Sequence, residues 1–183
     1  MPKILSNVKE KILKEGKELL QANGYNNLNI REVAKNSDIA VGTFYNYFSN
    51  KDELVREIIL NHWNQLLVTI DELSDSENSI KTKLISLSQY IDEFFKTYSG
   101  VFTAMMESTA TYCPRHKILP QLNTIVEKII TMAIEKGEIN PPLSVTKLSK
   151  ILVPSMFFIT KVEDLKFEDF YSILNLGNVE KNN

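Results

Sequence analysis

The sequence predicts an all-α protein of about nine helices, with an N-terminal three-helix helix-turn-helix domain and a C-terminal helical bundle. Two observations predict this class. Apolar residues recur at the three- and four-residue spacing of a helix through most of the 183 residues, and no alternating strand pattern competes with it. Polar, Gly or Pro breaks separate these stretches. With 43% hydrophobic residues, a chain of this length can bury a sizeable core.

The first helix is expected over about residues 7–22, because an apolar stripe ends at Asn23-Gly24, a C-terminal stop. A capping box pairs a cap residue with a Glu three positions later. Such pairs mark three helix starts in the first 55 residues: Asn7/Glu10, Asn29/Glu32 and Asn50/Glu53.

Two short apolar-periodic pieces follow, at residues 30–34 and 41–48, and the polar run 36–40 separates them. Two short helices joined by a tight turn make a helix-turn-helix candidate. Phe44 and Phe48 are four residues apart and share one face, so we expect them to lock the second piece onto the preceding helices. Thr43, Asn46 and Tyr47 are then expected to face away from that core.

The remainder of the chain predicts six more helices. They are expected over about residues 51–73, 80–97, 101–113, 118–137, 144–160 and 165–176. Pro154 lies inside one of them and should kink or split it. These elements divide the chain into a helix-turn-helix domain at 1–50, a helical domain at 51–177 and a flexible tail at 178–183.

The charge is distributed unevenly. Residues 1–51 carry a net charge of +3, whereas the remainder carries −5. This asymmetry is compatible with a phosphate-facing head on an acidic body, and also with ordinary solvated faces.

Several function classes are excluded or disfavoured. No apolar run approaches the ~18 residues of a membrane span, and the charged N-terminus lacks a secretion signal, so we expect a cytoplasmic protein without a membrane partner. Cys113 is the only cysteine, and Cys113 with His116 supplies too few ligands for zinc. Since catalytic and phosphate-loop motifs are also absent, we expect no metal, no cofactor, no catalytic residues and no enzyme.

The run from Gly24 to Leu54 resembles the signature of the TetR family of bacterial transcriptional regulators. It contains Ile30-Arg31-Glu32-Val33-Ala34, then Gly42-Thr43-Phe44-Tyr45-Asn46-Tyr47-Phe48, then Lys51-Asp52-Glu53-Leu54. The resemblance covers about residues 8–55 and implies binding to double-stranded operator DNA. It implies contacts with the groove and backbone of DNA for Gly42, Thr43, Tyr45, Asn46 and Tyr47, and contacts with phosphates for Asn29 and Lys51. Arg31 is also expected to bind DNA, because it is the one cation near enough to the predicted recognition helix to read guanine.

Three departures from the family pattern bear on specificity. Asp38, Ala40 and Val41 stand where family members often have Gly, Ser and a Lys or Arg. The predicted recognition helix therefore contains no cation, and we expect an A·T-rich operator core, because guanine is read mainly by Arg or Lys.

The resemblance also implies a homodimer formed through the last two helices. Apolar residues are dense there: Leu148, Ile151, Leu152, Met156, Phe157, Phe167, Phe170, Tyr171 and Leu174. The middle helices are rich in residue types that line adaptable small-molecule sites, although an ordinary core has the same composition. The candidate ligand pocket comprises Trp63, Tyr90, Phe94, Phe102, Met105, Met106 and Tyr112.

These features favour a ligand-responsive repressor that a small apolar or aromatic effector releases from a palindromic operator. Two other hypotheses stay open. A DNA-binding architectural or cell-division protein of the same fold would respond to no effector. A helical enzyme or carrier with an incidental front motif would have no salt-dependent affinity for DNA.

Overall fold

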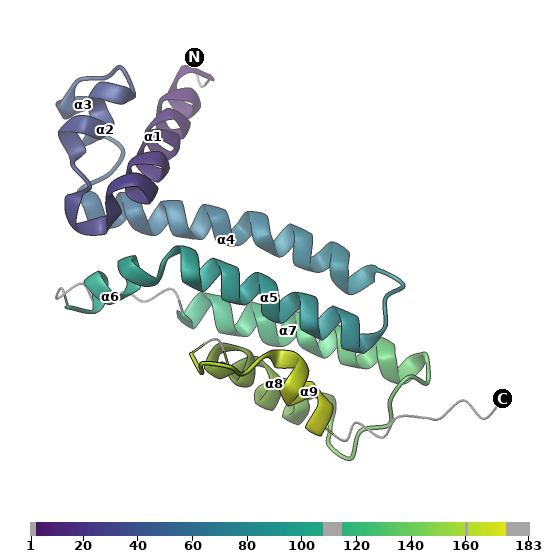
Figure 1. The fold of residues 1–183 in the computed structure, drawn as a ribbon. Helices are drawn as coiled ribbons and strands as arrows, with labels where there is room; N and C mark the ends of the chain where they lie inside the picture. Colours follow the sequence, from purple (N-terminus) through teal and green to yellow (C-terminus); the bar gives the residue numbers. More distant parts are fainter. Residues whose placement is uncertain (1–2, 108–114, 160, 175–183) are drawn as a thin grey trace. The chain divides into compact units, whose positions relative to one another are not determined.

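The computed structural model describes residues 3–107, 115–159 and 161–174. These residues form nine helices and no strand, in agreement with the predicted all-α class (Figure 1). No helix in this described part of the chain is long and apolar enough to cross a membrane.

The helices follow one another through short connections. Their bounds are α1 Lys3–Asn27, α2 Ile30–Asn36, α3 Val41–Phe44, α4 Lys51–Asp75, α5 Ile80–Thr97, α6 Ser99–Glu107, α7 Arg115–Glu135, α8 Val145–Ile159 and α9 Phe167–Ile173.

The chain divides into two compact units. The first comprises Met1–Asn64 and Tyr98–Pro114, and therefore holds α1, α2, α3, the first half of α4, and α6. Within it, α1 contacts α2 and α6, and α2 packs against α3. Its core contains Ile12, Phe44, Phe48, Leu54 and Trp63, each almost fully buried.

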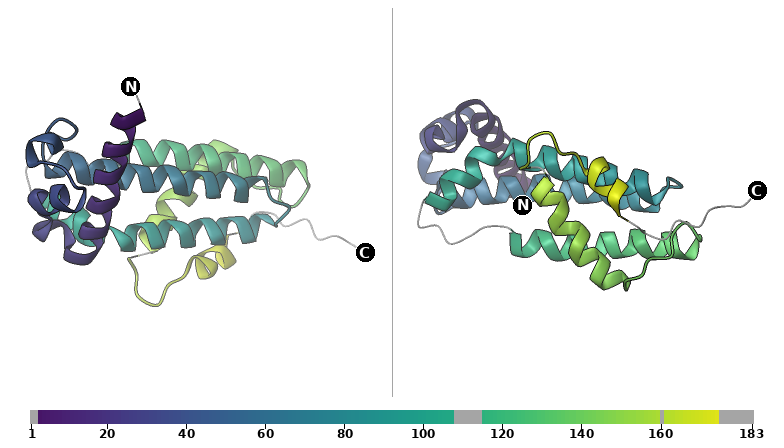
Figure 2. Two further views of the ribbon diagram at one scale, coloured as in Figure 1. Left: turned by 90° about the horizontal axis from the view of Figure 1, so that it is seen from above. Right: turned by 60° about the horizontal axis from the view of Figure 1, so that its bottom comes forward.

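The second unit comprises Gln65–Thr97 and Arg115–Asn183. Within it, α7 packs along α8, and α5 contacts α7, α8 and α9 (Figure 2). The carboxylate of Glu138 accepts a hydrogen bond from the backbone N–H of Ile80 at 2.9 Å and so caps the first turn of α5. At the other side of the α4–α5 connection, the buried Lys83 ammonium donates to the Ser74 carbonyl near the end of α4.

Several predicted boundaries were wrong. α1 begins at Lys3, so Asn7 lies inside the helix and is no cap. α7 begins at Arg115, three residues before the predicted start, and contains Pro120 in its second turn. α8 continues through Pro154 without splitting.

Other boundaries are confirmed. α5 spans the predicted residues 80–97. The predicted stop at Asn23-Gly24 appears as a break inside α1, since Gly24 has a φ of 73°, but the helix continues to Asn27 and not to residue 22. Of the predicted helix at 101–113, residues 108–113 lie outside the described residues, as do 175–183, which include the predicted tail.

Gly16 sets the distance between α1 and α4. A β-carbon at this position would lie 3.0 Å from Leu54 Cδ2 and 3.2 Å from Ile58 Cδ1, closer than ordinary van der Waals contact. The missing side chain therefore lets α4 approach α1 closely beneath the helix-turn-helix.

Candidate nucleic-acid interface

The turn between α2 and α3 is a Schellman motif. The N–H of Asp38 bonds the Lys35 carbonyl at 3.1 Å, and the N–H of Ile39 bonds the Ala34 carbonyl at 3.0 Å. Asp38 takes the left-handed position with a φ of 57°, where glycine is the usual residue. The same motif ends α7 with Gly137 at the corresponding position, at a φ of 68°.

The second helix of the motif is short. α3 covers four residues, and the following turn continues its hydrogen bonding, since the N–H groups of Tyr47 and Phe48 both reach the Phe44 carbonyl. Phe44 and Phe48 are buried with ring centroids 5.7 Å apart, as their spacing predicted. These two rings anchor the segment Val41–Phe48, called the reading segment below, on the unit.

The reading segment presents one exposed face. Val41, Gly42, Tyr45 and Asn46 are exposed, and their spacing places them on one side of the helical turns. Tyr45 is 53% exposed and Val41 is 37% exposed. A β-carbon on Gly42 would meet no heavy atom within 4 Å. This face therefore offers a valine, a phenol and an amide to any molecule that docks there.

The expectation that Thr43 and Tyr47 face away from the core was wrong in part. Both are half-buried, whereas Asn46 is exposed as expected. The predicted helical register holds, but α3 ends at Phe44, and the face opposite Phe44 and Phe48 is centred on residues 42, 45 and 46.

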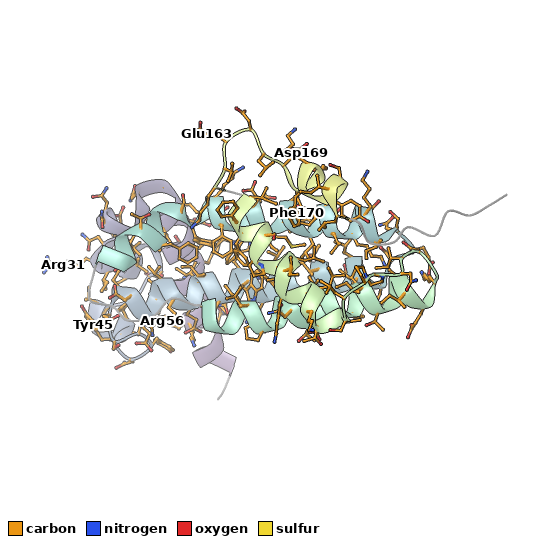
Figure 3. The ribbon with its side chains drawn as sticks, turned by 90° about the horizontal axis from the view of Figure 1, so that it is seen from below. Arg31, Tyr45, Arg56, Glu163, Asp169 and Phe170 are labelled. Carbon is orange, nitrogen blue, oxygen red and sulfur yellow. The ribbon has the colours of Figure 1, made fainter. Side chains whose placement is uncertain are left out.

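The start of α2 supplies the neighbouring surface. Asn29 is the N-cap of α2, and its Oδ1 accepts the N–H of Arg31 at 2.9 Å. Arg31 and Tyr45 lie at the outer edge of the first unit (Figure 3). Together with Asn29 and Lys51 they line one shallow depression. The structure thus gathers four of the eight predicted DNA-binding residues around one surface feature.

Lys51 is held by Tyr25. Its Nζ donates to the Tyr25 carbonyl at 3.0 Å and lies 4.4 Å from the centroid of the Tyr25 ring. The Tyr25 hydroxyl in turn donates to the carboxylate of Asp52. Lys51 and Asp52, the first two residues of α4, therefore both bind Tyr25, which directly follows the non-helical Gly24 in α1.

The predicted capping box at the start of α4 forms in part, since Asn50 caps the helix but Glu53 bonds Ser49 instead of Asn50. Asn50 Oδ1 accepts the N–H of Glu53 at 2.9 Å. The Glu53 carboxylate accepts from the hydroxyl of Ser49 at 2.6 Å and from its N–H at 2.7 Å. These hydrogen bonds lower the pKa of Glu53 and keep it ionised at the helix N-terminus, where a negative charge is stabilising.

Sequence reasoning missed two residues of this surface. Val41 is apolar and begins a helix, so its exposure follows only from how α3 sits on the unit. Tyr25 contacts a residue 26 positions away, which no local pattern indicates.

The predicted ligand-pocket residues are distributed over both units. Trp63 is buried and Phe102 half-buried in the first unit, and Phe94 is buried and Tyr90 half-buried in the second. The side chains of Met105 and Met106 and the whole of Tyr112 lie outside the described residues. Their assignment to a pocket stays a prediction.

A separate cavity of the second unit lies between α5, the end of α8 and the segment leading into α9. Met156, Ile159 and Phe167 give it an apolar floor, and Lys96 and Lys166 are among its polar residues. None of the predicted pocket residues is among the described residues that line it. Figure 3 shows Glu163, Asp169 and Phe170 on this segment and on α9.

The described part of the chain contains no group of three or more His, Cys, Asp or Glu side chains that could hold a metal ion. The Cys113/His116 pair considered in the sequence lies outside it in part, since Cys113 belongs to the residues 108–114.

A short helix anchored by two buried aromatics, with an exposed polar face and cations at its margin, defines a helix-turn-helix DNA-binding protein. The family model of bacterial regulatory proteins, tetR family, matches residues 12–58, which cover α1, α2, α3 and the start of α4. The chain belongs to this family, since it is also 32% identical over 152 residues to the HTH-type transcriptional regulator YvdT of Bacillus subtilis. That match covers 76% of the chain and 73% of YvdT.

Two further proteins are similar to the chain. The HTH-type dhaKLM operon transcriptional activator DhaS of Lactococcus lactis is 28% identical over 119 residues; the match covers 65% of the chain and 58% of DhaS. The structure of the regulator FadR from Bacillus subtilis in complex with stearoyl-CoA has a TM-score of 0.60 at 22% identity. This match covers 82% of the chain and 84% of FadR. The proteins that the family model describes are bacterial regulatory proteins.

Proposed function

We propose that the protein is a ligand-responsive repressor that binds a palindromic operator as a homodimer through the reading segment. The observation that carries this proposal is the exposed face of Val41, Gly42, Tyr45 and Asn46, which adjoins a depression lined by Arg31 and Lys51. Hydrogen-bonding groups on a short helix can enter the major groove, and cations at its margin can bind phosphates. The remaining predicted contacts are Asn29, Thr43 and Tyr47.

The direct test is selection of binding sites from a random duplex pool by the full chain. We expect enrichment of a sequence with two inverted half-sites about one helical turn apart, because one short helix reads too few base pairs alone. No enrichment over the starting pool would overturn the proposal. Coupling the selected site to a reporter gene separates a repressor from an activator, the role that the name of DhaS gives that protein.

The exposed apolar residues of α8 and α9 support dimerisation. Phe158 is 66% exposed, Ile151 45% and Ile173 77%, and exposed large apolar side chains mark interaction surfaces. Other residues expected at this interface, among them Leu148, Leu152, Met156 and Phe167, are buried inside the second unit. We expect Phe158→Glu to convert a dimer into a monomer in light scattering, whereas Lys161→Glu, also exposed, leaves the dimer intact.

The proposed effector is a small apolar or aromatic molecule that binds among the aromatics of the middle helices. The stearoyl-CoA bound to FadR, a protein of the same fold, supports testing acyl compounds first. If the compound binds in the predicted pocket, Phe94→Ala should no longer release the selected duplex when the compound is added. If instead Phe167→Ala fails to release the duplex, the compound binds in the cavity between α5 and α9. Absence of release by any compound tested would favour the architectural alternative.

A further inference from the structure

The reading segment and the turns that flank it are almost free of charge. Residues 36–50 contain a single charged side chain, Asp38, and no Lys or Arg. Bidentate recognition of the guanine O6 and N7 acceptors requires an Arg or Lys that projects into the major groove. The face that the reading segment exposes has none, so it cannot make the commonest contact to guanine.

What this face offers matches A·T base pairs. Val41 begins α3 and is 37% exposed, so its two methyl groups are available to a partner. Thymine differs from cytosine in the major groove by its C5-methyl group, which apolar side chains contact. Asn46 is exposed on the same face, and an asparagine amide pairs bidentately with adenine N6 and N7. Between them, Gly42 has no neighbour that would block close approach.

The cations near the reading segment lie on other elements. Lys9 of α1 lies 5.7 Å from the centre of the Phe48 ring, and its ammonium is paired with Glu57. Lys51 is occupied by the carbonyl and the ring of Tyr25. Arg31 is exposed and has no hydrogen bond or ion pair from its guanidinium to the described part of the chain. It shares the depression with Tyr45, next to the reading segment. Arg31 is therefore the cation placed to reach a base edge beside the positions that the segment reads.

From this arrangement we infer that Val41 is a specificity-determining residue that reads a thymine methyl group in an A·T core. Asn46 reads an adenine of that core, and guanine recognition is confined to Arg31 at one flanking position of each half-site. This inference rests on the proposed function, because it assigns bases to the proposed DNA-binding face.

The test is a cycle of protein and DNA changes on the selected duplex. Each core thymine is replaced in turn by deoxyuridine, which lacks the methyl group. At one thymine we expect the replacement to weaken binding of the wild type about fourfold, the effect of one buried methyl group. Val41→Ala should bind both duplexes equally, and Val41→Thr, which keeps one methyl group, should remain sensitive.

The Arg31 assignment is tested on the same duplex. Arg31→Ala should no longer discriminate between base pairs at the flanking G·C position, but it should still discriminate in the A·T core. The control is Lys35→Ala, because Lys35 is an exposed cation of α2 outside the depression; this variant should discriminate at both the flanking and the core positions. Circular dichroism confirms that each variant is folded. A G·C-rich core, or equal effects of deoxyuridine on the wild type and Val41→Ala at every core thymine, would overturn the inference and leave the proposed function standing. Failure to enrich any duplex would overturn the proposed function itself.

Discussion

The ammonium of Lys51 lies 4.4 Å from the centre of the Tyr25 ring and bonds the Tyr25 carbonyl at 3.0 Å. The first residue of α4 is thereby fixed to the end of α1, at the edge of the depression that also contains Arg31. A lysine held in this way is preorganised, because its side chain has lost rotamer freedom before any phosphate binds.

Replacement of Lys51 should weaken DNA binding without changing sequence preference. We expect Lys51→Ala to reduce affinity equally for the selected and a scrambled duplex and to lower the slope of log K against log salt by about 1, since one phosphate contact is lost. Fluorescence anisotropy at several salt concentrations measures both. The control is Lys147→Ala, because Lys147 is an exposed cation of the second unit; this variant should leave the slope unchanged. An unchanged slope in Lys51→Ala would remove Lys51 from the phosphate contacts.

The Schellman turn at Asp38 predicts a stabilising substitution. Asp38 has a φ of 57°, and its negative charge lies at the C-terminal end of α2, where the helix dipole disfavours it. We expect Asp38→Gly to raise the free energy of unfolding by about 0.5–1 kcal/mol, because both penalties are removed. Denaturant unfolding measures the change. Gly137→Ala, at the equivalent position after α7, should be destabilising; a gain in stability there would contradict the argument.

The close approach of α1 and α4 predicts intolerance of side chains at Gly16. Gly16→Val should destabilise the protein by about 1–3 kcal/mol, since its side chain must displace Leu54 and Ile58 in the packed core. Gly100→Ala is the matched control, because a β-carbon there meets no atom within 4 Å and alanine favours the helix. Thermal unfolding of both variants distinguishes them. Equal stability of Gly16→Val and the wild type would show that α4 can move away from α1 without cost.

Alkaline pH should destabilise the wild type through Tyr98. Burial raises the pKa of this phenol to about 12, and its hydroxyl lies 3.0 Å from His62 Nδ1. In the unfolded chain a tyrosine ionises near pH 10, so the folded state loses stability as the pH rises from about 10 to 12, and keeps all of it below pH 10. Tyr98→Phe lacks this ionisation. The unfolding free energy of the wild type minus that of Tyr98→Phe should therefore fall as the pH rises, by on the order of 2–3 kcal/mol over the full range. If the unfolding free energies of the wild type and Tyr98→Phe changed in parallel with pH, ionisation of Tyr98 would not be the cause of the loss of stability.

Local patterns predicted much of the fold. Phe44 and Phe48 lie in the core as their four-residue spacing indicated, and α2 and α4 begin after the predicted caps Asn29 and Asn50. The full capping boxes do not form, since Asn29 bonds the N–H of Arg31 and the Glu53 carboxylate bonds Ser49. α5 has its predicted bounds, because its apolar stripe is bordered by the polar run before Ile80. In these places the local signal and the packing agree.

The sequence predicted less where contacts between distant residues determine a helix boundary or the exposure of a side chain. Asn7 has a capping pattern but lies inside α1, since the preceding residues also form helix. Whether Thr43 or Tyr45 is exposed depends on how α3 packs against the rest of the first unit. The hydrogen bond from Lys51 to the Tyr25 carbonyl joins residues that are 26 positions apart in the sequence. Periodicity alone contains no information on either.

The most direct test of the DNA-binding assignment is the affinity of Asn46→Ala for the selected duplex, measured against a scrambled duplex at two salt concentrations. The control is Asn140→Ala, an exposed asparagine of the second unit. We expect Asn46→Ala to lose about tenfold or more in specific affinity, since one bidentate base contact is removed, and to keep salt-dependent nonspecific binding. Unchanged specific affinity of Asn46→Ala, with Asn140→Ala equal to the wild type, would contradict the assignment of this face to operator DNA.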